Sequence, residues 1–270
     1  MSKKGWAVVT GASAGLGAEF VRQLAKRGYD VVLVARRRDR LVALAREVEA
    51  AHSVKTEIVE ADLAAAGATA ALVKKLDELG VVVEVLVNNA GVGLYGFAID
   101  QSVEKSTAMI ELNIVALTEL SLALGRKMAE RGSGGILNVS STASFQPDPY
   151  FAVYGATKAY VTSFSLALAS EVKSRGVRVL AHCPGPTRTE FNDVADVRAG
   201  ASDLLYMSAE RCVAIGLRAL ERGKWLVVTG WLNAIAAFFS RRSPLRLATI
   251  GAGYLMRPVR AAAALPPKAP

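Results

Sequence analysis

Short runs of apolar residues alternate along the chain with longer segments in which apolar residues recur every three or four positions. The short runs predict strands, and the longer segments predict amphipathic helices. Most of the short runs are rich in Val, Ile and Leu and do not alternate with polar residues, as expected for a parallel sheet covered on both faces. The pattern predicts a single α/β domain with a doubly wound parallel sheet of about seven strands. We expect strands at residues 6–10, 31–35, 56–60, 83–88, 135–140, 178–183 and 225–228, and helices at residues 15–27, 39–50, 65–79, 103–130 (with a break near the centre), 154–174 and 209–221.

The chain beyond residue 230 has a different pattern. Two apolar stretches, 231–239 and 247–255, flank Arg241, Arg242 and Arg246. We expect a domain at residues 1–230, a C-terminal helical extension at 231–260 and a disordered Ala/Pro-rich tail at 261–270. The extension has the composition of a helix that lies on an anionic membrane surface. A cover over a substrate cleft and a contact in a dimer fit the same pattern, so three roles remain open.

Charge and composition narrow the function. The 270 residues carry 33 Lys and Arg against 24 Asp and Glu, and the net charge of +9 suits an anionic ligand or surface. No zinc-finger spacing, basic zipper or aromatic-rich RNA-binding motif is present, so nucleic acid is not the expected partner. The few thiols and imidazoles predict neither a metal site nor a disulfide framework. They are Cys183, Cys212, His52 and His182, of which Cys183 and His182 are expected to fill the core.

The N-terminus runs directly into the first predicted strand. It has no apolar segment followed by a cleavage site, and no uninterrupted run of about 18 apolar residues occurs in the chain. The sequence therefore predicts a cytoplasmic protein without a spanning helix, and it leaves peripheral membrane contact to the C-terminal extension.

A glycine-rich turn joins the first predicted strand to the first helix. Glycines allow a tight turn and let a phosphate approach the backbone N–H groups at the positive end of a helix. The strand before the turn and the helix after it are the context that dinucleotide binding requires. We therefore predict that a dinucleotide binds at Gly11, Ser13, Ala14, Gly15, Leu16 and Gly17.

The end of the second predicted strand indicates which dinucleotide binds. A site for NAD places a carboxylate there to hold the ribose 2′-hydroxyl. Here the sequence is Ala35-Arg36-Arg37-Arg38, and guanidinium groups suit a 2′-phosphate. We predict NADP(H) as the cofactor, with Arg36 as the first contact and Arg37 and Ser13 as helpers.

Tyr154 and Lys158 lie four residues apart in a predicted helix and share one of its faces. A nearby cation favours the ionised form of a phenol, whose pKa is ordinarily about 10. Alone, this pattern is more often a solvated pair on a surface helix. It gains meaning from the cofactor turn and from motifs that follow in order: Asp62-Leu63, Asn88-Asn89-Ala90-Gly91, Asn113, Ser140-Ser141 and Pro184-Gly185.

Together these motifs span nearly all of residues 5–230, and the chain resembles the classical short-chain dehydrogenases/reductases of the NADP-preferring bacterial type. The resemblance implies a Rossmann-like fold and a homodimer or homotetramer built on the helices at 103–130 and 154–174. It implies catalytic roles for Asn113, Ser141, Tyr154 and Lys158. It also implies cofactor contacts from Asp62, Leu63, Asn89, Ala90, Gly91, Tyr154, Lys158, Pro184, Gly185, Thr187 and Thr189. Pro186 departs from the family by stiffening the loop that carries the two threonines.

The implied mechanism is hydride transfer between the nicotinamide and a carbonyl carbon. Tyr154 exchanges a proton with the substrate oxygen, and Ser141 orients that oxygen. Lys158 lowers the pKa of Tyr154 and binds the nicotinamide ribose, and Asn113 holds a water that links Lys158 to solvent. The ordinary structural explanations are a packed tyrosine, a strand-end serine and an asparagine that kinks a helix, and they do not explain why all the motifs occur together.

Apolar residues gather where the substrate is expected. They predict a hydrophobic ketone or secondary alcohol with an acyl, aryl or steroid-like body, although a role in the core or in a subunit contact fits them equally. The alternatives to a carbonyl reductase are a 3-oxoacyl thioester reductase, an alcohol-oxidising dehydrogenase and a non-catalytic NADPH-binding regulator or scaffold. The candidate pocket residues are Leu94, Tyr95, Phe97, Phe145, Tyr150, Phe191 and Leu205.

Overall fold

A computed structural model describes residues 4–187 and 206–257 of the chain. Seven parallel strands form one sheet in the order β3-β2-β1-β4-β5-β6-β7, which confirms the predicted doubly wound sheet. The chain moves outward from β1 in one direction and, after β3, returns to β4 on the other side of β1. The carboxyl ends of β1 and β4 therefore flank the point where such folds bind ligands. The strands are β1 (Trp6–Thr10), β2 (Asp30–Ala35), β3 (Thr56–Glu60), β4 (Val83–Asn88), β5 (Gly134–Val139), β6 (Val177–Cys183) and β7 (Leu226–Val228).

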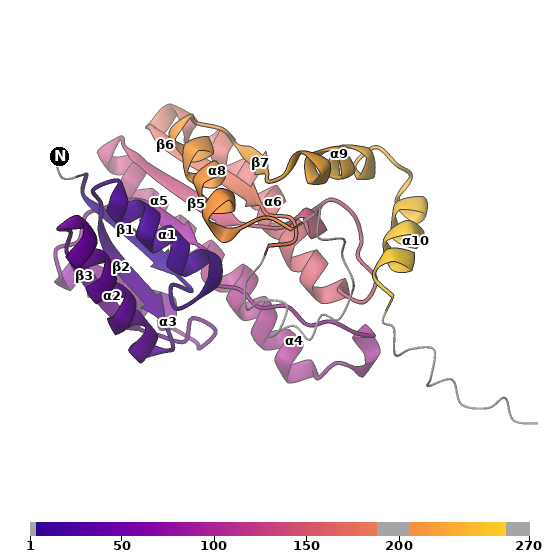
Figure 1. Ribbon diagram of the computed structural model, residues 1–270, viewed down its shortest axis with the longest axis horizontal. Helices are drawn as coiled ribbons and strands as arrows, with labels where there is room; N and C mark the ends of the chain where they lie inside the picture. Colours follow the sequence, from indigo (N-terminus) through magenta and orange to yellow (C-terminus); the bar gives the residue numbers. More distant parts are fainter. Residues whose placement is uncertain (1–3, 188–205, 258–270) are drawn as a thin grey trace, which may run out of the picture.

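Helices cover both faces of the sheet (Figure 1). One hydrophobic core packs α1 (Gly15–Lys26), α2 (Arg38–His52) and α8 (Ala209–Glu221) on one face. A second core packs α3 (Ala68–Glu78), α5 (Leu117–Arg131) and α6 (Ala152–Val172) on the other. Short helical turns, η1 (Ala98–Asp100), η3 (Thr142–Ser144) and η4 (Lys173–Arg175), lie in the connections.

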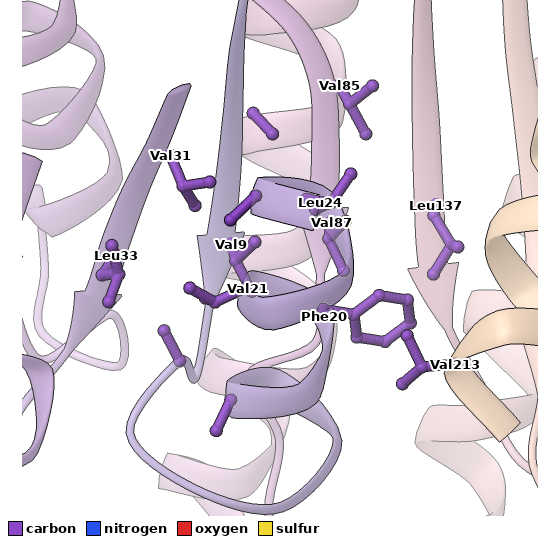
Figure 2. Close-up of a cluster of buried hydrophobic side chains, with 14 of the residues drawn as sticks. Val9, Phe20, Val21, Leu24, Val31, Leu33, Val85, Val87, Leu137 and Val213 are labelled. Carbon is purple, nitrogen blue, oxygen red and sulfur yellow. The ribbon is translucent and has the colours of Figure 1, made fainter. Parts of the chain in front are cut away.

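Strand residues supply the two cores alternately. Val9 faces the first core, whereas its neighbour Val8 faces the second. Figure 2 shows Phe20 of α1 projecting between the sheet and Val213 of α8. Each such buried apolar side chain contributes about 1.5–3 kcal/mol, and together they hold α1, and with it the turn before α1, against the sheet.

The long helix predicted at residues 103–130 is interrupted at its centre. It consists of α4 (Val103–Ile110), a π-helical segment η2 (Glu111–Ala116) and α5, so the predicted break is present. Among the described residues, Val103–Arg131 is the one helix that is long and apolar enough to span a membrane. The sequence prediction excluded such a segment, because it looked only for uninterrupted apolar runs. In the fold, Leu120, Leu124 and Met128 of this helix pack against the sheet.

The C-terminal extension forms two helices, α9 (Trp231–Ser240) and α10 (Leu245–Leu255). They lie beyond β7, apart from the helices that cover the sheet (Figure 1). The predicted tail at 261–270 lies outside the described residues.

Candidate active site

A tight turn between β1 and α1 forms one end of the site. Gly11 has a φ of +67°, and a β-carbon at Gly17 would lie 2.1 Å from the carbonyl oxygen of Gly11. Only glycine fits this close approach of the two backbone segments. Asn89 fixes the turn from the end of β4, because its Nδ2 donates to the carbonyl oxygen of Thr10 at 2.9 Å. The turn brings the N-terminal amides of α1 to the edge of the sheet, where they suit a phosphate.

A cavity of about 510 Å³ runs along the carboxyl ends of the strands from this turn. The predicted cofactor residues that line it are Gly11, Ser13, Ala14, Gly15, Leu16, Arg36, Arg37, Asp62, Leu63, Asn89, Ala90, Gly91, Tyr154, Lys158, Pro184, Gly185 and Thr187. Gly17 does not line the cavity but supports the turn from within α1. Thr189 lies outside the described residues.

The two arginines at the end of β2 form the basic edge of the cavity. Nε of Arg37 donates to Oγ of Ser13 at 3.2 Å, which joins the strand end to the glycine turn. Arg36 is exposed, and its Nη1 lies 3.5 Å from Oδ2 of Asp62. The residues that the sequence assigned to a 2′-phosphate therefore lie together, and their guanidinium donors fit such a group.

Tyr154 and Lys158 lie on one face of α6 and line the middle of the cavity. The Lys158 Nζ lies 5.7 Å from the centroid of the Tyr154 ring and donates to the carbonyl oxygen of Val139 at 2.9 Å. Ser141, which follows β5, shares a hydrogen bond with Tyr154. A strand end and a helix thus bring together three of the four predicted catalytic residues.

Burial controls the charge of both groups. It raises the pKa of Tyr154 to about 12, although the hydrogen bond with Ser141 opposes this shift. It lowers the pKa of Lys158 to about 8. The predicted lowering of the tyrosine pKa is therefore not a property of the protein groups alone, because desolvation is the largest effect and the charges of Asp148 and Cys183 raise the pKa further.

Asn113 occupies the π-helical segment and does not line the cavity directly. Its Nδ2 donates to the Val92 carbonyl oxygen at 2.9 Å and to Oγ1 of Thr157 at 3.0 Å, and its Oδ1 accepts from the Val92 amide at 3.0 Å. Asn113 therefore joins the loop after β4 to the helix that carries Tyr154 and Lys158. The π turn, a feature common at functional sites, brings its side chain to that position.

The candidate substrate residues that the structure describes are not part of the lining of this cavity. The described ones, Leu94, Tyr95, Phe97, Phe145 and Tyr150, do not line the cavity, whereas Phe191 and Leu205 lie outside the described residues. The loop after β4 folds back onto the start of α6, where the Gly96 amide donates to the Tyr150 carbonyl oxygen at 2.9 Å. Ring contacts then run from Phe97 through Tyr150 and Tyr95 to Phe151 and Tyr154.

Other residues form the substrate end of the cavity. They come from the segments after β4 and β6, from the segment between β5 and α6, and from residues that precede α8 or follow α10: Val92, Ala143, Gln146, Asp148, Phe151, Pro186, Tyr206 and Met256. No motif marked Gln146, Asp148 or Met256, although an aspartate between two prolines in an apolar stretch was a signal that could have been followed. His182 and Cys183, expected to fill the core, are fully buried.

The C-terminal extension covers this end of the cavity. Tyr95 Oη donates to the Met256 carbonyl oxygen at 2.6 Å, and Ser240 Oγ donates to Oε1 of Gln146 at 2.7 Å. Of the three predicted roles, these contacts favour the cover over the cleft.

The fold and the cavity together define a dinucleotide-binding site with an acid/base pair at its centre. A family model described as short chain dehydrogenase matches residues 5–198. The chain belongs to this family of oxidoreductases, which act on CH–OH and C=O groups.

Relatives within the family differ in their named substrates. A very-long-chain 3-oxoacyl-CoA reductase of Coprinopsis cinerea is 40% identical over 183 residues, which are 66% of this chain and 53% of the relative. The chain thus matches about half the length of that relative. The 17-beta-hydroxysteroid dehydrogenase type 3 of Homo sapiens is 30% identical over 256 residues, which are 93% of this chain and 82% of the relative. A solved short-chain dehydrogenase from Sphingobium yanoikuyae, in complex with NADPH, is 32% identical with a TM-score of 0.80, covering 88% of this chain and 93% of that one.

Proposed function

We propose that this protein is an NADPH-dependent carbonyl reductase that converts hydrophobic ketones to secondary alcohols. The observation that supports the proposal is that Tyr154, Lys158 and Ser141 line the same cavity as the glycine turn and the two arginines. The end toward Arg36 and Arg37 is basic, as a 2′-phosphate requires, and the opposite end contains apolar groups from Phe151 and Met256.

When bound, the reduced nicotinamide supplies the hydride. Ser141 holds the substrate oxygen, and Tyr154 gives it a proton as negative charge develops there. A phenol with a pKa near 12 is protonated at neutral pH and thus ready to act as the acid. Lys158, with a pKa near 8, can exchange protons under the same conditions and so resupply Tyr154. Asn113 holds the Val92 loop against α6 and so positions the pair.

The best-supported alternative substrate is a 3-oxoacyl thioester. The name of the Coprinopsis cinerea relative favours it, whereas the name of the human relative favours a steroid ketone. A panel of acyl, aryl and steroid ketones, each with NADPH and NADH, separates these substrates. Turnover of no ketone or alcohol, together with tight NADPH binding, would instead identify a regulator or scaffold.

Tyr154→Phe tests the acid/base role directly. It removes only the hydroxyl group, so we expect kcat to fall by at least about 100-fold while the Kd for NADPH stays nearly unchanged. Steady-state kinetics and fluorescence titration measure the two quantities. Tyr160→Phe is the matched control, because Tyr160 lies on the same helix but is exposed and contacts Thr118. Equal activity of the two variants would remove Tyr154 from the proton transfer.

We further propose that the protein forms a homo-oligomer through α5 and α6. Leu122 and Tyr160 are exposed apolar residues on these helices, and Tyr160 stacks on Phe164 at 5.8 Å between ring centroids. These side chains give the two helices an apolar outer surface that a second copy can bury.

The outer surface of the C-terminal extension suits an anionic membrane. Trp231 and Tyr254 expose 72% and 84% of their surface, and residues 231–270 contain no Asp or Glu. Arg241 and Arg242 lie between the two helices, and the Arg242 guanidinium lies 3.6 Å from the centroid of the Phe238 ring. Two copies joined through this surface would bring like charges together, whereas anionic lipid neutralises them. The extension would thus cover the cavity on one side and contact lipid on the other.

A further inference from the structure

One carboxylate lies among the residues at the substrate end of the cavity. Asp148 is only 5% exposed, yet it lines the cavity together with Phe151 and Met256. It lies before α6, where its carbonyl oxygen accepts from the Phe151 amide at 3.1 Å. A buried carboxylate loses its hydration and is costly unless hydrogen-bond donors replace the water. Its position beside the reacting groups therefore calls for a partner.

The protein supplies one donor and directs it to one oxygen. Ser240 of α9 donates to Oε1 of Gln146, which orients the amide so that Nε2 donates to Oδ1 of Asp148 at 2.8 Å. Among the described residues, no group donates a hydrogen bond to Oδ2 of Asp148. This oxygen is also not fully buried. Oδ2 therefore opens on the cavity with its lone pairs available.

No cation in the described part of the chain forms an ion pair with Asp148. Burial raises the pKa of the carboxyl group to about 6, which leaves it mostly ionised at neutral pH. A polar group built to accept a hydrogen bond from a ligand discriminates strongly against an analogue without the donor, because the protein group is then left unpaired.

We propose that Asp148 is a specificity-determining residue that accepts a hydrogen bond from a hydroxyl or amide N–H group of the substrate. The proposal rests on the proposed reductase function and narrows its substrate class. The substrate is a hydrophobic ketone, or the corresponding alcohol, that carries a hydrogen-bond donor separate from the reacting carbonyl. Gln146 and Ser240 act as positioning residues, since they turn Oδ2 of Asp148 toward the ligand.

The test compares matched ketones that differ by one hydroxyl group. Suitable pairs are the hydroxycyclohexanone isomers against cyclohexanone and hydroxylated steroid ketones against their deoxy analogues. We expect the wild-type protein to prefer at least one donor-bearing ketone in kcat/KM. Asp148→Leu should reduce this preference at least about 10-fold, mainly through KM, and Asp148→Asn, which keeps an acceptor but loses the charge, at least about 3-fold. Asp100→Leu, at an exposed carboxylate outside the cavity lining, should leave the preference unchanged.

Two outcomes overturn the proposal: a wild-type protein without donor preference, or an unchanged preference in an Asp148 variant that still binds NADPH and melts cooperatively. If Asp148→Leu does not fold, Asp148→Asn decides. The proposed function fails separately, if no ketone is reduced at all. The ratio of the two ketones' Kd values for the NADP-loaded protein, measured by calorimetry, then still shows whether Asp148 recognises the donor.

Discussion

At the scale of single residues, the main feature of the site is a tyrosine and a lysine whose buried surroundings favour the uncharged form of each side chain. Burial favours the neutral phenol of Tyr154 and the neutral amine of Lys158. The two shifts bring the lysine, but not the tyrosine, into the range of ordinary pH. Of the two, Lys158 is thus the group whose charge changes more readily near neutral pH. In the proposed mechanism, Tyr154 is the group that donates when the substrate oxygen becomes basic.

We expect the arginines at the end of β2 to determine the choice of dinucleotide. Arg36→Asp replaces a guanidinium group with a carboxylate where a 2′-phosphate is expected. We expect the KM for NADPH to rise about 10- to 100-fold, and that for NADH to change little, because only NADPH carries the additional charge. Steady-state kinetics with both cofactors at one ionic strength measure this.

Arg38→Asp is the matched control for Arg36→Asp. Arg38 is exposed and begins α2, but it does not line the cavity. The Arg38→Asp variant should keep the wild-type ratio of the KM for NADPH to the KM for NADH. A parallel rise for NADPH and NADH in Arg36→Asp would contradict the assignment of Arg36 to the 2′-phosphate.

More of the residues predicted for the cofactor than of those predicted for the substrate line the cavity. Gly11, Arg36 and Tyr154 occur at fixed places relative to a strand or to one another, and these local constraints are visible in the chain. The substrate end depends on how segments far apart in sequence meet. Nothing local shows that Met256 lines the cavity or that Tyr95 does not, because both follow from the packing of α10 and the loop after β4.

At the scale of elements, the junction of β1 and α1 depends on one missing side chain. Gly17→Ala would place a methyl group 2.1 Å from the Gly11 carbonyl oxygen, and backbone cannot move aside as a flexible side chain can. We expect α1 to shift from the sheet, with a loss of about 2–4 kcal/mol in stability and a large loss of NADPH affinity. Thermal melting and fluorescence titration measure the two effects.

Gly251→Ala serves as the comparison, because Gly251 is also helical and a β-carbon there meets nothing within 4 Å. It should be neutral or slightly stabilising, since alanine favours a helix more than glycine does. A Gly17→Ala protein as stable as this control would show that the turn can relax, and the argument from close approach would fail.

The predicted elements match the structure closely wherever periodicity determines them. The predicted bounds of β1, β3, β4 and α8 are those of the structure, and most others differ by one to three residues. The π-helical character of η2 was not predictable, since Glu111–Ala116 carries no residue that breaks a helix. The extra residue per turn is held by tertiary contacts, above all those of Asn113 with Val92 and Thr157.

At the scale of the whole molecule, the C-terminal extension contacts residues at and beside the cavity. Hydrogen bonds to Gln146 and Tyr95 link the extension, α9 and α10, to the substrate end of the cavity. The solvent-exposed surface of the extension is apolar and basic. If the proposed membrane contact forms, the cavity would lie beside the bilayer, where a hydrophobic ketone concentrates.

The membrane contact predicts selective binding to anionic vesicles. The protein should sediment with phosphatidylcholine vesicles that contain phosphatidylglycerol and not with phosphatidylcholine alone, and added salt should weaken the binding. Arg241→Glu combined with Arg242→Glu should lower the partition coefficient at least about 10-fold, because each basic residue near such a surface contributes about 1 kcal/mol. Trp231→Ser should weaken binding through lost apolar burial, with little change in its salt dependence.

Net charge alone would also attract a protein of charge +9 to anionic lipid, so the control must change charge equally elsewhere. Arg46→Glu combined with Arg126→Glu does so at exposed positions of α2 and α5. If attraction is general, both double variants lose binding alike, and the extension has no special role. If the extension makes the contact, only the variant with both Arg241→Glu and Arg242→Glu loses binding to the vesicles. Ketone reduction in vesicle suspensions should then slow for that variant alone, while its activity on water-soluble ketones stays at the wild-type level.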